Sequence, residues 1–407
     1  MDRTYEATRL RAVPFSGIRR IMGEANRLEA AGASIIHLEI GRPDFDTPAH
    51  IKEAAKAALD RGDVHYTANQ GTLALRSAIA RKLKRENGLE YDPETEILVT
   101  VGACEGVFLS GAAFLDPGDE MLVPDPAWVN YYNVPGLVGA GQSSYPLREE
   151  AGFQIEPDRV EAAITPRTKI LVLLSPGNPT GAVAEPECLA ELTRIAEKYD
   201  LLVVSDEIYE RIVYDGARHV SFASLPGMRQ RTIVLNGFSK TYSMTGWRLG
   251  YVAAPRELMP SLLKVHQNLT TCAVSFAQAG GIAALEGPQD CVAAMVAEFK
   301  RRRDMLVAAL RQIPGVTCVM PRGAFYVFAN LRAYGLTSED MAMYILREAG
   351  VAVVPGPAFG PRSEGYVRIS YANSYDRIWE ATQRMTAALA KLPRVDRDAG
   401  RHNSGRG

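Results

Sequence analysis

The residues with the clearest chemical potential lie in segment 236–251, directly after the apolar run 232–235, which predicts a buried strand. Lys240 follows the end of that strand among small and hydroxyl residues. A lysine at the mouth of a buried strand is poorly solvated, so its pKa falls and its neutral amine can form a Schiff base. Ser239 and Arg248 offer a hydroxyl and a guanidinium that suit a phosphate group. These features match what pyridoxal phosphate requires of a protein, although the segment alone fits a solvated surface lysine equally well.

Two further strand ends carry groups that suit the ring of the same cofactor. Asp206 follows the apolar run 201–204, and Tyr209 comes three positions later, on the same face if the chain turns helical there. A buried aspartate can keep a pyridinium nitrogen protonated, which makes the ring an electron sink. Tyr209 and the amide of Asn178 can donate hydrogen bonds to a phenolate oxygen. Taken alone, Asp206 also fits a helix cap, and the turn around Asn178 fits an ordinary proline-glycine turn.

Three more positions extend the set. Gly102 comes between a strand and a helix that begins at Ala103, and the N–H groups of Ala103 and Cys104 at such a helix start can bind phosphate. Trp128 follows a strand and can stack on a flat ring, or it can be a half-buried core residue. Arg368 lies within an apolar strand and needs a carboxylate, either from the protein or from an amino acid substrate. The dinucleotide pattern G-x-G-x-x-G and the P-loop lysine pattern are both absent from the sequence.

The elements that must position these groups alternate between strands and helices. Strands are predicted at 97–101, 120–124, 169–174, 201–204 and 233–235, and helices at 103–115, 128–138 and 185–199. Several of the strands are continuous apolar runs, which is typical of parallel strands buried on both faces. The alternation predicts a doubly wound α/β domain that binds ligands at the carboxyl ends of its strands.

A smaller α+β domain is predicted for the remaining chain. Its expected helices are 17–31 after an N-cap at Ser16, 288–312, 338–349 and 374–392, and its expected strands are 35–40, 316–320, 324–330, 351–354 and 366–371. Another helix is expected from Pro48 to Leu59 with Thr47 as its N-cap. Residues 299–304 are interpreted as the solvated part of the long charged helix. We expect the large domain at 45–285, the small domain at 1–44 and 286–393, and a disordered tail at 394–407.

The composition of the chain limits the partners, metal sites and cellular compartment that we expect. The chain has 407 residues, 47% of them hydrophobic and 23% charged, with a formal net charge of −1, so neither a nucleic acid nor an anionic membrane is an expected partner. Its five cysteines are scattered, odd in number and without a C-x-x-C pair, which argues against a disulfide framework and a structural zinc site. The first residues lack the apolar stretch of a signal peptide, and no run is long enough to span a membrane. We therefore expect a cytoplasmic protein.

These motifs make the sequence similar to the class I and II aminotransferases, which are fold type I pyridoxal-phosphate enzymes. The resemblance covers nearly the whole chain and rests on the stretches Gly41-Arg-Pro-Asp-Phe45, Tyr66 with Gly71, Pro126-Ala-Trp128, Asn178-Pro-Thr-Gly181, Asp206-Glu-Ile-Tyr209, Ser239-Lys-Thr-Tyr-Ser-Met-Thr-Gly-Trp-Arg248 and Val367-Arg-Ile369. It implies a large domain with a mostly parallel seven-stranded sheet beside the smaller domain. It also implies an amino acid:2-oxo acid aminotransferase that works by ping-pong transamination.

Carried over by position, the resemblance gives the catalytic groups their roles. Lys240 would form the Schiff base with the cofactor and later act as acid and base on the substrate's Cα proton. Asp206 would pair with the pyridine nitrogen, while Asn178 and Tyr209 would hold the phenolate oxygen.

The resemblance also assigns the groups that bind phosphate and substrate. The phosphate would be held by Ser239, Arg248 and the amides of Ala103 and Cys104. Tyr66 would reach the phosphate of a neighbouring subunit, which implies a homodimer with shared sites. Arg368, with Asn178 and the Gly41 backbone, would bind the substrate's α-carboxylate.

Three departures from the family pattern are visible. Arg42 stands where many relatives have glutamate, and Ala103-Cys104 differs from common versions of the phosphate loop. The stretch from Phe15 to Arg19, expected to line the side-chain pocket, matches no version that would identify the substrate.

Two other functions are compatible with parts of the pattern. The same groups can support a lyase, cyclase or oxidase, because all of these reactions share the carbanion at Cα. A regulator that fuses this fold to a DNA-binding domain is not expected, since only about 15 residues precede the first predicted helix.

Overall fold

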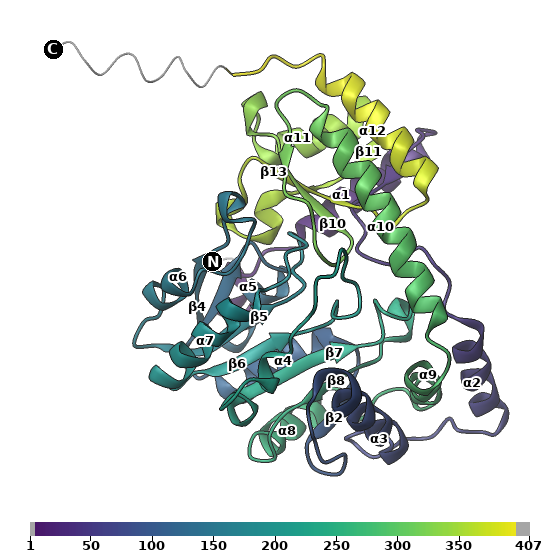
Figure 1. Ribbon diagram of the computed structural model, residues 1–407, viewed down its shortest axis with the longest axis vertical. Helices are drawn as coiled ribbons and strands as arrows, with labels where there is room; N and C mark the ends of the chain where they lie inside the picture. Colours follow the sequence, from purple (N-terminus) through teal and green to yellow (C-terminus); the bar gives the residue numbers. More distant parts are fainter. Residues whose placement is uncertain (1–4, 396–407) are drawn as a thin grey trace.

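A seven-stranded sheet forms the centre of the computed structural model, which describes residues 5–395 (Figure 1). Its strands, in spatial order, are β2 (Ile97–Thr100), β8 (Gly250–Ala253), β7 (Thr232–Gly237), β6 (Leu202–Asp206), β5 (Thr168–Leu174), β3 (Glu120–Asp125) and β4 (Gly141–Pro146). β8 pairs antiparallel with both β2 and β7, and the other neighbours pair in parallel. The expectation of a mostly parallel seven-stranded sheet is confirmed.

Helices cover both faces of this sheet, as a doubly wound fold requires. On one face, α4 (Ala103–Phe114), α5 (Asn130–Val138) and α8 (Met259–Leu269) share a core with Val204 and Ile233. On the other face, α3 (Leu73–Lys82) and α9 (Ser275–Glu286) pack near β2 and β8, and α2 (Ala49–Asp60) packs on α9. α6 (Pro157–Ala162) and α7 (Pro186–Lys198) complete that face beside Val203. Because Val203 and Val204 point to opposite faces, the continuous apolar run of β6 serves both cores.

Two strands of this sheet have no strand-like pattern in the sequence. β4 reads Gly-Gln-Ser-Ser-Tyr-Pro and lies at the sheet edge, where solvent covers part of it and polar residues are tolerated. β8 is only four residues long and begins at Gly250, where an added Cβ would lie 2.5 Å from the backbone nitrogen of Ala103. Glycine at this position therefore allows β8 to pass close to the start of α4.

The remaining elements form a second group above the sheet in the view of Figure 1. A four-stranded sheet has the order β12 (Val354–Pro355), β13 (Tyr366–Ser370), β10 (Tyr326–Asn330) and β9 (Thr317–Cys318), and it is antiparallel throughout. The helices of this group are α1 (Gly17–Ala30), α10 (Asp290–Arg311), α11 (Ser338–Tyr344) and α12 (Tyr375–Leu389). β1 (Ile36–His37) pairs in parallel with β11 (Val351–Ala352), which joins the N-terminal segment to the C-terminal part.

The interpretation of residues 299–304 as a solvated segment is wrong for half of its residues: Arg301 is exposed and Lys300 and Asp304 are partly exposed, whereas Phe299, Arg302 and Arg303 are buried. Phe299 is fully buried and Arg303 is 1% exposed. Arg303 donates hydrogen bonds to Asp215 Oδ2 at 2.6 Å and to the Pro321 carbonyl oxygen at 2.8 Å. Long basic side chains on α10 thus enter the interior because carboxylate and carbonyl oxygens there accept their hydrogen bonds.

Two boundaries near the N-terminus also differ from the expectation. The extended segment predicted at 35–40 forms a ladder only at Ile36 and His37. α2 has Pro48, not Thr47, as its N-cap. The hydroxyl of Thr47 instead donates to the Ser243 carbonyl oxygen at 2.7 Å, so it ties this segment to the loop after β7.

Among the helices of residues 5–395, none combines the length and the apolar character needed to cross a membrane. Residues 396–407 of the expected tail lie outside the described part of the chain.

Candidate active site

A cavity of about 510 Å³ lies at the carboxyl ends of the parallel strands, between the large sheet and the second group of elements. Most of the residues selected from the sequence line it: Gly41, Ala103, Cys104, Trp128, Asn178, Asp206, Tyr209, Ser239, Lys240, Arg248 and Arg368. Segments far apart in the chain therefore meet at one place, as expected for a doubly wound sheet.

Lys240 occupies the interior of this cavity, three residues after the end of β7. Its Nζ donates a hydrogen bond of 2.5 Å to the Gly41 carbonyl oxygen. Burial, and then the guanidinium groups of Arg368 and Arg248, lower the pKa of Lys240 to about 8. A substantial fraction of this amine is therefore neutral, and nucleophilic, at mildly basic pH.

Asp206 is the last residue of β6 and is 3% exposed. Burial raises the pKa of this carboxyl group to about 6, even though a hydrogen bond from Tyr131 opposes the rise. Tyr131 donates from its hydroxyl to Asp206 Oδ2 at 2.7 Å, and the Ile208 amide donates to Oδ1 at 3.1 Å. Sequence reasoning missed Tyr131; its position three residues after Trp128, in a predicted helix, was the only available signal.

Tyr209 lies near Asp206, although no helix forms between them. The chain makes a turn over residues 208–211, and Tyr209 is 3% exposed. Its hydroxyl is 2.7 Å from the hydroxyl of Tyr326, which also lines the cavity. Tyr326 was likewise missed, because an aromatic residue in the apolar strand β10 looks like ordinary core.

Arg368 is 1% exposed and lies in the middle of β13. It donates to Asn178 Oδ1 at 3.1 Å and to the Glu39 carbonyl oxygen at 2.5 Å, while its buried Nε has no hydrogen-bond partner. None of the carboxylates in residues 5–395 forms an ion pair with it. Burial lowers the pKa of Arg368 from its usual value. A buried guanidinium with a free donor fits a carboxylate brought by a ligand.

The turn before α4 has the form of a phosphate cradle. Gly102 has φ +77° and is the N-cap of α4, and an added Cβ there would lie 2.7 Å from Arg248 Nη2. Arg248 also has a left-handed backbone (φ 52°), which brings its guanidinium close to this turn. Ser239 and the helix start at Ala103 lie in the same cavity. Backbone amides, a hydroxyl and a guanidinium are the donors that a phosphate group needs.

Cys104 and Trp128 line the cavity next to this turn. Asn130 donates its amide to Cys104 Sγ at 3.0 Å. Burial raises the pKa of the Cys104 thiol, so it stays protonated and is a poor nucleophile. The Trp128 ring meets Tyr131 edge-on, with ring centroids 6.1 Å apart.

Tyr66, expected at the phosphate, lies away from this cavity. It is 88% exposed and does not line the cavity of its own chain. The expected side-chain pocket is also only partly as predicted: Ser16, Ile18 and Arg19 line the cavity, whereas Phe15 is fully exposed outside it.

The residues that line this cavity fit the amine-binding, ring and phosphate parts of pyridoxal phosphate. Lys240 offers the amine, Asp206 an acid for the ring nitrogen, Asn178 and Tyr209 polar groups, and the Gly102 turn a phosphate cradle that a larger residue would fill.

Comparison with known proteins agrees with this fit. The family model "Aminotransferase class I and II" matches residues 33–384. An aromatic-amino-acid aminotransferase of Thermococcus litoralis is 44% identical over 94% of this chain and 97% of its own, and an aspartate aminotransferase of Pyrococcus abyssi is 45% identical with the same coverage. The crystal structure of the aspartate aminotransferase from Rhizobium meliloti superimposes with a TM-score of 0.92 at 39% identity, covering 96% of this chain and all of the other.

Proposed function

The chain belongs to the class I and II aminotransferases, and from this premise we propose which of its residues carry out the reaction. It is a pyridoxal-phosphate-dependent enzyme that transfers an amino group between an amino acid and a 2-oxo acid. The observation that carries the assignment of roles is the position of Lys240, whose amine of lowered pKa lies in one cavity with Asp206, Asn178 and Arg368.

Pyridoxal phosphate supplies an aldehyde that accepts an amino group and a ring that withdraws electrons from the substrate's Cα. Lys240 Nζ would hold the cofactor through its aldehyde carbon and would act as acid and base on the proton at the substrate's Cα. Asp206 holds a proton on the ring nitrogen, supported by the hydrogen bond from Tyr131. Asn178 and Tyr209 orient the ring through its phenolate oxygen.

Arg368 binds the α-carboxylate of the substrate. Its support is the buried Nε without a partner and the absence of an ion-paired carboxylate among the described residues. Asn178 Oδ1 and the Glu39 carbonyl oxygen orient the guanidinium, so that little side-chain entropy is lost when substrate binds.

For the substrate side chain, we propose that acidic amino acids are accepted; the Pyrococcus abyssi relative is named an aspartate aminotransferase. Arg19 lines the cavity from α1, and no hydrogen bond or ion pair in the described chain engages it. Its neighbours Ile18 and Met22 are apolar and suit the methylene groups between two carboxylates. Arg19 therefore suits the distal carboxylate of a dicarboxylic substrate.

We propose a homodimer in which Tyr66 of each chain completes the phosphate site of the other. The support is its exposure outside its own cavity. The division into residues 45–285 and residues 1–44 with 286–393 also remains a proposal, as does a cytoplasmic location, which the five free thiols favour.

Activity of two single variants and their mixture tests these roles. Lys240→Ala should abolish transamination, whereas Lys264→Ala, at an exposed lysine of α8, should leave it unchanged. Mixing Lys240→Ala with Tyr66→Phe subunits should restore one intact site per mixed dimer. Turnover by Lys240→Ala would overturn the role of the lysine, and activity no higher than that of Tyr66→Phe alone would overturn the shared site.

A further inference from the structure

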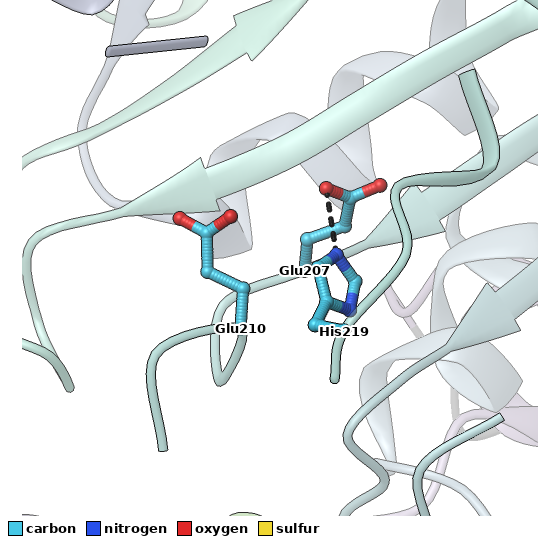
Figure 2. A group of neighbouring side chains, drawn as sticks. All are labelled: Glu207, Glu210 and His219. Atoms are coloured by element: carbon cyan, nitrogen blue, oxygen red, sulfur yellow. Dashed lines mark ion pairs between the residues drawn. The ribbon is translucent and has the colours of Figure 1, made fainter. Parts of the chain in front are cut away.

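A buried charged cluster lies directly behind the turn that carries Asp206. Figure 2 shows Glu207, Glu210 and His219 as neighbours, with an ion pair between Glu207 and His219; with Lys82 they are called the rear cluster below. Asp206 lines the cavity, whereas Glu207, the residue after the end of β6, does not. The side chain of Glu207 is 1% exposed, which makes the rear cluster part of the interior.

Glu207 attaches the end of β6 to its surroundings through both its carboxylate and its backbone. Its Oε1 accepts hydrogen bonds from Ser205 at 2.8 Å and from Ser221 at 2.6 Å. Its Oε2 lies 3.1 Å from His219 Nε2, and its amide donates to the Leu235 carbonyl oxygen at 2.9 Å. The contact with His219 lacks hydrogen-bond geometry, so Glu207 is fixed by the two serine hydroxyls and by its own backbone amide.

Glu210 fixes the other end of the same turn. It pairs with Lys82 of α3 and accepts a hydrogen bond of 2.8 Å from Asn87. Burial opposes its ionisation, yet Lys82 and His219 hold the pKa of Glu210 at about 2, so it is charged at neutral pH. Burial also opposes the charging of His219, but Glu207 and Glu210 raise its pKa above the usual value.

The carboxylates of the rear cluster find their partners within the protein. Two carboxylates face the ammonium of Lys82 and the imidazole of His219, and Lys82 already occupies an oxygen of Glu210. A divalent cation would have to displace Lys82, so the arrangement favours an internal ion network over a metal site.

Asp206 and Tyr209 alternate along the turn with the two anchored glutamates. The Glu210 amide donates to the Glu207 carbonyl oxygen at 2.9 Å, and the Ile212 amide donates to that of Tyr209 at 2.8 Å. A shift of either glutamate therefore moves the backbone that carries the two groups of the cavity.

We infer that Glu207 and Glu210 are positioning residues, which act through the turn 206–210 to set where Asp206 and Tyr209 meet the cofactor. This inference rests on the roles proposed above for Asp206 and Tyr209. It predicts that replacing these glutamates lowers kcat and the affinity for the cofactor by more than a loss of stability alone would cause.

The test compares Glu207→Ala with a matched control. Glu120→Ala removes another buried glutamate, which accepts from Thr165 at 2.7 Å and from Arg167 at 2.8 Å at the opposite end of the sheet. Glu207→Ala should lower kcat about 100-fold, the size of effect expected when a catalytic group is misplaced by about 1 Å, with KM changing less than about 3-fold. It should also weaken pyridoxal phosphate binding to the apoenzyme, measured by absorbance titration. Glu120→Ala should lower Tm with neither effect.

Two milder variants keep the test decisive if Glu207→Ala does not fold. Glu207→Gln retains an oxygen for the hydroxyls of Ser205 and Ser221 and should recover most of the lost kcat, whereas Ser221→Ala should lose an intermediate amount. Equal behaviour of the Glu207 variants and Glu120→Ala, with loss of Tm alone, would overturn the inference. Asp206→Asn is measured in parallel: full activity of that variant would overturn the proposed role of Asp206 instead.

Discussion

Tyr131 donates a hydrogen bond of 2.7 Å to Asp206 Oδ2, and both side chains are buried. The pair connects α5 to the end of β6, which are far apart in the sequence. Tyr131 therefore supports the charged form of an acid whose burial favours the neutral form.

Replacing Tyr131 by Phe should impair both catalysis and cofactor binding. The variant leaves a buried carboxylate oxygen without its donor, which costs about 1–3 kcal/mol. We expect the pKa of Asp206 to rise further, kcat to fall and pyridoxal phosphate to dissociate more readily. Steady-state kinetics and cofactor titration check this. Wild-type kcat and cofactor affinity in Tyr131→Phe would show that Asp206 needs no such support.

Replacing Arg368 by Gln should raise KM for every amino acid substrate. Loss of a buried charge-assisted contact costs at least about 2 kcal/mol, which corresponds to roughly 30-fold in kcat/KM. Arg303→Gln is the control, because Arg303 is equally buried but pairs with Asp215 outside the cavity. That control should lose stability and keep its KM. If both variants raise KM alike, the effect of Arg368 is not substrate binding.

Replacing Arg19 by Gln should lower kcat/KM for acidic substrates much more than for neutral ones. Loss of one partly solvated charge-assisted contact is worth about 1.4 kcal/mol, so kcat/KM for aspartate and glutamate should fall about 10-fold, while that for alanine should stay within about 2-fold. Arg20→Gln is the matched control, since the neighbouring Arg20 pairs with Glu339 and does not line the cavity. A parallel loss for acidic and neutral substrates would contradict the proposed contact.

The lowered pKa of Lys240 predicts a pH dependence of stability in the apoenzyme. Between about pH 8 and pH 10.5 the unfolded chain keeps a proton on this lysine that the folded chain has released. The free energy of unfolding should therefore increase with pH across this window, relative to Lys240→Met. Urea denaturation of both proteins at several pH values measures the difference. Parallel curves for the two proteins would mean that the amine is not perturbed.

The sequence allowed the fold and most of the cavity to be predicted because both depend on local patterns. Continuous apolar runs identify the parallel strands, and Lys240, Asp206 and Asn178 follow those runs directly. Tyr131 and Tyr326 could not be predicted, since a tyrosine in a helix or an apolar strand has no local mark of its partner. Tyr131 finds Asp206 only through packing across 75 positions of sequence.

The local sequence pattern also could not show which charged side chains are buried. Residues 299–304 look solvated because five of the six are charged, and only the tertiary position of α10 brings Arg303 to Asp215. The same holds for the rear cluster, in which Lys82 and Glu210 meet from segments 128 positions apart. β4 and β8 were missed because their sequences are polar or short, and their strand conformation is imposed by neighbours.

The central claim is that Lys240 transfers amino groups in the cavity formed with Asp206 and Arg368. The most direct measurement is the absorbance of the holoenzyme as a single amino acid is added without any 2-oxo acid. We predict that the bound cofactor converts to its amine form with one equivalent of 2-oxo acid released per site, and that Lys240→Ala fails to convert. Ammonia accumulating beyond one equivalent per site, or conversion by Lys240→Ala at the wild-type rate, would contradict the account.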